Sequence, residues 1–355
     1  MKLTKFFSKI FDALSTDIGI DLGTANTLVY VRGKGIVLNE PTIVALNKKT
    51  GQLVAIGNDA KTMLGRTPGH IEVVRPLVHG VISDFEVTEE MLAYLLTKVR
   101  STVRTIVAPR VLIGVPSGIT SVEMRAARDA AKNAGARDVL LVEEPIAAAI
   151  GAKLPIHKPQ GSMIIDIGGG TTDIAVISLG GIVTAQNLRI AGDQLNSDIV
   201  SYIRDQFKVL VADKTAEDTK ITLASVEENG LAKELVVRGR DIVTGLPREV
   251  AITDSDIREA ISGSVNAIVE AARDVIERTP PEVLADVMQK GITLAGGGAL
   301  IPGFPKLLEN VLKIPVVVVP DPLRGVIRGI GTVLEQLETY EELLANEEDA
   351  FTAHA

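Results

Sequence analysis

Two segments of the chain place an aspartate directly beside a turn rich in glycine and threonine. Residues 18–27 read Ile-Gly-Ile-Asp-Leu-Gly-Thr-Ala-Asn-Thr, and residues 164–173 read Ile-Ile-Asp-Ile-Gly-Gly-Gly-Thr-Thr-Asp. Both continue into a second apolar run, which is typical of a β-hairpin. Backbone N–H groups in such a turn can approach an anion closely because glycine has no Cβ, and the aspartate suits hydrated Mg²⁺. Two facing hairpins of this kind would grip a metal-bound polyphosphate from both sides.

A third glycine run, residues 296–298, follows the apolar segment 292–295. One glycine-rich turn alone is more often structural, but three turns that each follow a strand jointly predict nucleotide binding. Other phosphate-binding signatures are absent: no G-x-x-x-x-G-K-[ST] occurs, and Asp173 stands where a dinucleotide fingerprint starting at Gly168 needs glycine.

The elements around these turns alternate between strands and helices. Strand signals over residues 17–46 are followed by a predicted helix at 83–99, a strand at 111–115 and a helix to about residue 134. Next come a strand at 139–142 and a helix that opens at Pro145, a favoured position for proline. This alternation predicts a largely parallel sheet covered on both faces.

The same order begins again after residue 161, which predicts an internal duplication with the ligand in the cleft between two α/β halves. The polar stretch 212–256 reads as a small inserted subdomain. Residues 57–80 look helical and then loop-like, and the acidic tail from Glu335 looks helical.

Composition narrows the possible functions. At 355 residues and 37.7 kDa the chain is long enough to form two domains. Its hydrophobic content of 46% includes only 3% aromatic residues, which indicates an aliphatic core. The absence of cysteine excludes disulfides and thiolate metal sites, and the 4 histidines lack metal-ligand spacing. A net charge of −8 argues against nucleic acid as a partner. No apolar run reaches the ~18 residues that would span a bilayer.

The first fourteen residues differ from the rest. At 100° per residue, apolar side chains fall on one arc and Lys2, Lys5 and Lys9 fall opposite. The apolar arc consists of Leu3, Phe6, Phe7, Ile10, Phe11 and Leu14. This pattern predicts an amphipathic helix in the membrane surface with its lysines toward anionic headgroups. The alternative is a terminal helix docked on the protein's own core, whereas Lys9 and Asp12 argue against a secretory signal.

The motifs together resemble a known superfamily. The paired hairpins, the segment 113–117 and the Leu-Ala-Gly-Gly-Gly-Ala-Leu segment at 294–300 match the five-part pattern of the actin-like ATPases. Further segments make the chain similar to the MreB family of bacterial actin homologues: residues 33–41, 65–69, 115–118, 143–151 and 279–282. The likeness covers residues 1–335. Small departures are Leu223-Ala224 in place of Ile-Gly and Ala295 in place of Thr.

The resemblance implies an actin-like fold, that is, a ribonuclease-H-like duplicated α/β fold with two α/β domains, each carrying a smaller subdomain, and a nucleotide cleft between them. The implied boundaries are a membrane helix at 1–14; subdomain IA at 15–32, 81–150 and 325–355; IB at 33–80; IIA at 151–190 and 257–324; and IIB at 191–256.

The resemblance also assigns roles to residues of the turns. Asp21 and Asp166 match the acidic residues around Mg²⁺, which they hold through water, and Glu144 matches the catalytic carboxylate that orients or deprotonates the attacking water. Thr171 would bond the same water or the γ-phosphate. The implied nucleotide-binding residues are Thr24, Ala25, Asn26, Gly168, Gly169, Gly170, Thr171, Glu217, Asp218, Thr219, Lys220, Gly296, Gly297, Gly298 and Ala299. Without the family likeness, Glu217 and Lys220 would read as an i,i+3 ion pair on an exposed helix.

The partners implied by the resemblance are ATP and Mg²⁺, further copies of the chain in double protofilaments, lipids of the inner face of the cytoplasmic membrane, and membrane proteins of cell-wall elongation. Ile106 and Val107 lie where the family often has a second membrane-binding element, although an ordinary helix-to-strand loop fits that segment equally well. Hydrolysis would act as a timer of polymerisation.

Two other classes are compatible with the motifs. An actin-fold small-molecule kinase would need a second substrate pocket with its own acid or base, and no spare carboxylate demands that role. A chaperone ATPase would need a C-terminal peptide-binding domain, for which the chain is too short.

Overall fold

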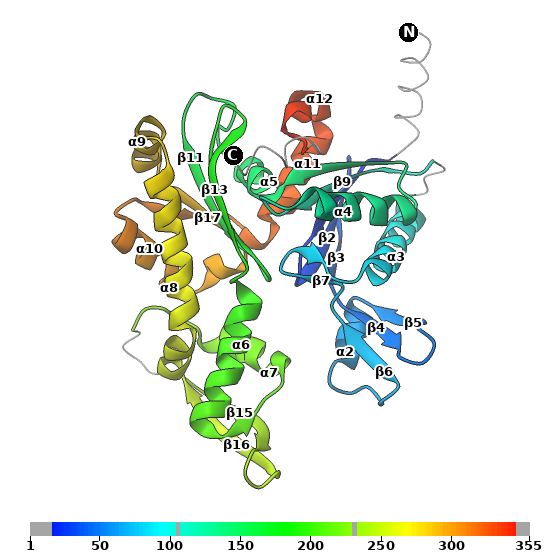
Figure 1. Cartoon of the computed structure of the whole chain (residues 1–355), viewed down its shortest axis with the longest axis vertical. Helices are drawn as coiled ribbons and strands as arrows, with labels where there is room; N and C mark the ends of the chain where they lie inside the picture. Colours follow the sequence, from blue (N-terminus) through cyan, green and yellow to red (C-terminus); the bar gives the residue numbers. More distant parts are fainter. Residues whose placement is uncertain (1–15, 104–106, 229–232, 346–355) are drawn as a thin grey trace. The chain divides into compact units, whose positions relative to one another are not determined.

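The computed structural model describes residues 16–103, 107–228 and 233–345. The chain divides into two compact units (Figure 1). The first unit comprises the chain up to residue 158 together with 179–182 and 324 onward, and the second comprises 159–178 and 183–323. Each unit has its own large apolar core, built mainly from valine, isoleucine, leucine and alanine. The prediction of an aliphatic core is therefore confirmed.

The central sheet of the first unit has the strand order β10-β9-β1-β2-β3. Strand β1 pairs antiparallel with β2 and parallel with β9, and β9 pairs parallel with β10. The strands are β1 (Ile18–Leu22), β2 (Asn26–Val31), β3 (Gly35–Pro41), β9 (Arg110–Val115) and β10 (Asp138–Glu143). The carboxyl ends of β1, β9 and β10 consequently lie next to one another along one edge of the sheet.

The central sheet of the second unit repeats this plan with the order β13-β12-β11-β17-β18. Strand β11 pairs antiparallel with β12 and parallel with β17, and β17 pairs parallel with β18. The strands are β11 (Ser162–Ile167), β12 (Thr172–Ser178), β13 (Gly181–Leu188), β17 (Ile292–Ala295) and β18 (Val316–Val318). In both units the glycine-rich turn joins the first two strands, so the predicted duplication is confirmed.

Helices pack on these sheets, and several begin where the sequence supplies a cap. Thr120 and Thr253 each form a capping box with the acidic residue three positions on. The helices of the first unit include α3 (Phe85–Val103), α4 (Ser121–Asn133), α5 (Glu144–Gly151) and α11 (Gly325–Glu335). Those of the second unit include α6 (Gly192–Tyr202), α7 (Asp213–Leu223), α8 (Asp254–Arg278), α9 (Pro281–Lys290) and α10 (Phe304–Leu312). In the described part of the chain, no helix combines the length and the apolar run needed to cross a membrane.

Each unit also carries a small sheet. In the first unit β4 (Val44–Asn47) lies between β5 (Leu53–Ile56) and β6 (Ile71–Val74), beside α2 (Asn58–Met63). Strand β6 lies where the sequence suggested a loop, and it forms because β4 offers it a pairing edge. In the second unit β15 (Glu234–Asp241) pairs with β16 (Pro247–Thr253) and β14 (Val209–Leu210), so the polar stretch 212–256 contributes the long hairpin of a small sheet. A two-residue pair, β7 (Leu77–Val78) and β8 (Val81–Ile82), completes the first unit's strands.

Helices α5 and α11 approach each other unusually closely. A Cβ at Gly329 would overlap the carbonyl oxygen of Ala147, and a Cβ at Gly151 would overlap that of Gly325. Both obstacles are backbone atoms, so neither can swing aside as a side chain could. The two helices therefore depend on glycine at this crossing, and α5 is the helix that starts at Glu144.

Replacing Gly329 with alanine should destabilise the protein by about 3 kcal/mol, because the helices must separate to admit the methyl group. Gly263 offers a matched control: it lies in α8 with nothing within 4 Å of an added Cβ. Gly263→Ala should stabilise by about 0.5–1 kcal/mol through the backbone alone. Urea unfolding of both variants measures the difference, and equal effects would contradict the packing argument.

Candidate functional site

Three acidic residues lie at the edge where the three parallel strands of the first unit end. Asp21 pairs with Gly114 across β1 and β9, and Gly114 pairs with Val142 across β9 and β10. Glu143 closes β10, and Glu144 opens α5 directly after it. The carboxyl edge of parallel strands is where α/β proteins commonly bind ligands. The strand order thus brings the predicted metal residue Asp21 and the predicted catalytic residue Glu144 to a common edge.

Gly114 leaves space that Glu144 uses. The Cγ of Glu144 lies 3.5 Å from the place where a Cβ at Gly114 would stand, and side chains of Val326 and Ile330 on α11 crowd the same place. Glu144 is partly buried. Its side chain is therefore packed along the end of β9, at the start of a helix whose N-terminus favours a negative charge.

The first glycine turn, residues 23–26, is fixed by contacts with neighbouring segments. Gly80 donates its N–H to the hydroxyl of Thr24 at 2.9 Å, and Thr42 donates its N–H to the carbonyl of Ala25 at 3.0 Å. Thr24 is buried, Ala25 is partly exposed and Asn26 is exposed. The turn is thus anchored on its inner side and accessible on its outer side.

The second glycine turn is closed by a hydrogen bond from the N–H of Gly168 to the carbonyl of Thr171, at 2.9 Å. Asp166 and Thr171 are both buried, with 8% and 6% of their surface exposed. Asp166 lies opposite Asp173 on β12, and the amide of Asn187 holds the Asp173 carboxylate at 2.9 Å.

The amino end of α6 packs on this second turn, a contact that the sequence did not reveal. Gly192 donates its N–H to the carbonyl of Gly168 at 3.2 Å, and Asp193 donates to that of Gly169 at 2.8 Å. The ammonium of Lys220 on α7 donates to the carbonyl of Gly192 at 2.8 Å. The local sequence there offers only a glycine at the start of α6. Lys220 and the glycine tip, predicted as parts of one site, are therefore connected through Gly192.

The other predicted residues of α7 differ in their surroundings. Glu217 and Lys220 are partly exposed, and Asp218 is exposed. Thr219 is fully buried, and its hydroxyl donates to the carbonyl of Thr215 one turn earlier in the same helix. The side chains of Glu217 and Lys220 thus remain within reach of a ligand, whereas the hydroxyl of Thr219 serves its own helix.

The third glycine run meets the second hairpin at the ends of β11 and β17. Gly296 has a φ of 79°, and a Cβ there would overlap the carbonyl of Ile167 and the carboxylate of Asp166. A Cβ at Gly298 would likewise overlap the Ile167 side chain. Gly297 to Leu300 then form a short 3-10 helix that includes Ala299. Glycine is required here because the chain passes directly over the end of the neighbouring strand.

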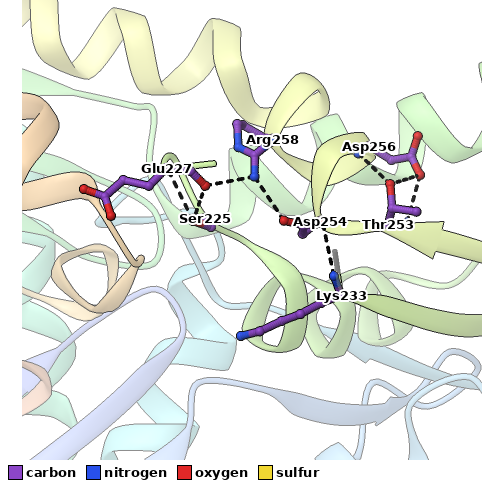
Figure 2. A network of polar contacts seen from close by, with 7 residues as sticks. All are labelled: Ser225, Glu227, Lys233, Thr253, Asp254, Asp256 and Arg258. Atoms are coloured by element: carbon purple, nitrogen blue, oxygen red, sulfur yellow. Dashed lines mark hydrogen bonds and ion pairs between the residues drawn. The ribbon is translucent and has the colours of Figure 1, made fainter. Parts of the chain in front are cut away.

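A polar network fixes the segment that follows α7 (Figure 2). The guanidinium of Arg258 donates to the carbonyl of Glu227 at 2.9 Å and to the carboxylate of Asp254 at 3.1 Å. The hydroxyl of Ser225 donates to the same Glu227 carbonyl at 2.9 Å. Val226 donates its N–H to the carbonyl of Pro302, just beyond the third glycine run. The residues just after α7 are therefore tied both to α8 and to the segment after Gly296–Ala299.

The second unit thus brings together the second hairpin, Lys220 and the third glycine run, as the sequence predicted. The first unit brings together Asp21, Glu144 and the first hairpin. The residues predicted to bind the membrane include Leu3, Phe6, Phe7, Ile10, Phe11 and Ile106, and these six lie outside the described residues. Val107 is described and is partly buried.

Asp21 in the first unit and Asp166 in the second are the residues that the resemblance assigns to magnesium. Burial raises the pKa of Asp21 to about 7. A partly buried, desolvated carboxylate of this kind fits a cation, because a nearby positive charge would offset the cost of keeping it ionised. Among the residues that the structure describes, no group of three or more His, Cys, Asp or Glu could hold a metal directly.

The protonation of Asp21 should make the stability of the nucleotide-free protein depend on pH. The unfolded carboxyl has an ordinary pKa of 3.8, so the folded state binds the proton more tightly and loses this stabilisation as pH rises through about 7. Between pH 5.5 and 8.5 the loss should be about 2 kcal/mol. Asp21→Asn should remove that decline. Urea unfolding of both proteins across this range tests it, and parallel pH profiles would contradict the burial of an ionisable Asp21.

Comparison with known proteins identifies the family. The family described as MreB/Mbl protein matches residues 15–342. The cell shape-determining protein Mbl of Bacillus subtilis is 49% identical over 323 residues, 91% of this chain and 96% of its own. The cell shape-determining protein MreB of Escherichia coli K12 is 46% identical over 338 residues, covering 94% and 97% of the two chains. The chain belongs to the MreB/Mbl family.

Solved structures agree with this membership. MreB5 of Spiroplasma citri bound to ADP superimposes with a TM-score of 0.87 at 39% identity, covering 92% of this chain and 98% of that one. The same protein bound to AMPPNP gives 0.86 at 40% identity with equal coverage. The MamK double helical filament gives 0.77 at 23% identity, covering 90% and 99%, and supports the fold alone. The fold of this chain is therefore actin-like, as the resemblance implied.

Proposed function

We propose that this chain is an ATP-dependent, filament-forming cytoskeletal protein that acts at the inner face of the cytoplasmic membrane to direct cell-wall synthesis and rod shape. Its relatives are cell shape-determining proteins, and MreB5 has been solved with ADP and with AMPPNP. The observation that supports nucleotide binding most directly is the convergence of the second hairpin, Gly192, Lys220 and the third glycine run within one unit.

The proposed mechanism combines the roles implied by the family resemblance with the local geometry of each unit. The N–H groups of the two glycine turns bind phosphate oxygens, and the partly exposed Glu217 and Lys220 of α7 contact the nucleoside. Asp21 and Asp166 would hold Mg²⁺ through water, and the ion would supply positive charge that offsets the charge of the phosphates. Glu144 orients the attacking water and accepts its proton, with Thr171 as a further hydrogen-bonding group.

The ATPase acts as a timer of assembly rather than as metabolic chemistry. ATP favours addition of subunits, and hydrolysis weakens the contacts between them. Polymerisation also multiplies membrane attachment, because many weak amphipathic segments on one filament bind together. Recruitment of cell-wall elongation proteins would follow from this placement along the membrane.

Glu144→Ala should slow phosphate release about 100-fold while polymers still form with ATP, since only the group that activates water is lost. Glu143→Ala is the matched control, because it removes the neighbouring carboxylate from the end of β10. Phosphate release and sedimentation of both variants are measured together. A Glu144→Ala protein that hydrolyses ATP at the wild-type rate would refute its catalytic assignment.

Deletion of residues 2–11 should abolish co-sedimentation with vesicles that contain anionic lipid and should leave nucleotide affinity unchanged. Phe7→Asp should reproduce the loss, because it places a charge on the apolar arc. Ser8→Asp introduces the same charge away from that arc and should retain most binding. The anchor hypothesis fails if the deletion variant still floats with lipid.

The alternative function is a small-molecule kinase, and one assay can distinguish it from the proposed filament-forming ATPase. Phosphate transfer to candidate metabolites at rates far above hydrolysis would favour it over the filament timer. The family relatives named above are cell shape-determining proteins rather than kinases, which favours the first proposal.

A further inference from the structure

Thr42 is a fully buried residue that touches the first glycine turn through both its backbone and its side chain. Its hydroxyl donates to the carbonyl of Gly23 at 2.6 Å, and its N–H donates to the carbonyl of Ala25 at 3.0 Å. It follows directly after β3, far in sequence from the turn that it contacts. One residue therefore holds two of the carbonyl groups in this turn.

These two bonds determine where the turn's N–H groups point. No cis peptide bond occurs in the described residues, and in a planar trans peptide the C=O and the following N–H point in opposite directions. With the Gly23 carbonyl drawn toward Thr42, the N–H of Thr24 faces the other way. The Ala25 carbonyl is likewise drawn toward Thr42, so the N–H of Asn26 also points away from Thr42. Both N–H groups are thus directed away from Thr42, toward the accessible side of the turn.

A second buried hydroxyl fixes the orientation of the first. The Oγ1 atoms of Thr27 and Thr42 are 2.9 Å apart, and both residues are fully buried. A hydroxyl has one proton, and that of Thr42 is donated to Gly23. Thr27 must therefore be the donor in the pair, so that a hydrogen-bonded chain runs from Thr27 through Thr42 to the turn.

The strand end that carries Thr42 is itself anchored by Glu40. The Glu40 carboxylate is 8% exposed and accepts hydrogen bonds from the backbone and side chain of Asn58, at 2.9 and 2.7 Å, and from Lys98 at 2.8 Å. These donors belong to α2 and α3. Charge-assisted bonds of this kind are stronger than neutral ones. Thr42 is therefore held in place from two helices as well as from its own strand.

We propose that Thr42 is a positioning residue for phosphate binding, which holds the first glycine turn so that its N–H groups are presented to the nucleotide. This inference rests on the proposed nucleotide binding and adds a residue outside the glycine turns. Thr42 itself does not touch the ligand. Without its hydroxyl the Gly23 peptide can rotate, and the turn must be ordered when the phosphates bind.

Thr42→Val keeps the shape and the backbone N–H but removes the hydroxyl. Its Kd for AMPPNP with Mg²⁺ should rise about tenfold, and Thr42→Ser should restore the wild-type Kd. Calorimetric titration measures the Kd values, and thermal unfolding of the nucleotide-free proteins reports stability. If Thr42→Val does not fold, Thr42→Ala replaces it, and we expect the same rise in the Kd for AMPPNP.

Thr88→Val is the matched control. Thr88 is also fully buried in the first unit, and its hydroxyl donates to the carbonyl of Asp84 at the same distance of 2.6 Å. Its removal should lower the melting temperature and leave the Kd unchanged. A wild-type Kd in Thr42→Val, or an equal rise in Thr88→Val, would overturn the positioning role. Failure of the wild-type protein to bind AMPPNP would refute the proposed function itself.

Discussion

The structure depends on close approach of backbone to backbone at the carboxyl ends of parallel strands. Where β17 ends beside β11, Gly296 passes over the carbonyl of Ile167 with no room for a Cβ. A similar approach places Ala147 of α5 against Gly329 of α11. These contacts set the positions of Asp166 and Glu144, because each residue lies on one of the two approaching segments. The positions of the Asp166 and Glu144 side chains therefore depend on the close backbone contacts at Gly296 and Gly329.

Repetition of one strand order in both units explains why the two hairpins look alike in sequence. Each hairpin joins the central strand to its antiparallel neighbour, and the parallel strands on the other side supply the rest of the edge. In the first unit that edge carries Glu144, and in the second it carries the third glycine run. The same scaffold thus provides different groups at equivalent places, and under the proposed function it would separate phosphate binding from activation of water.

Local patterns predicted much of this arrangement. The hairpins, the parallel strands and the helix at Glu144 all have strong local signals in apolar runs, glycine turns and Pro145. What could not be predicted depends on pairing between distant segments. Strand β6 forms only because β4 has a free edge, and Gly192 meets Gly168 only because α6 folds back on the hairpin. Thr42 gave no signal at all, since a threonine after a strand is ordinary until its carbonyl partners are known.

The electrostatics of Asp21 connect folding with ligand binding. Burial raises its pKa to about 7, so the carboxyl keeps its proton to a much higher pH than an ordinary aspartate does. A cation held through water favours the ionised form, and binding it must therefore release part of a proton. Under the proposed function, a cation held near this carboxylate would offset the cost of ionising it in a desolvated position. The same desolvation that favours the protonated carboxyl would therefore make the affinity of the proposed site for a cation rise with pH, and it would do so at the edge where β1, β9 and β10 end.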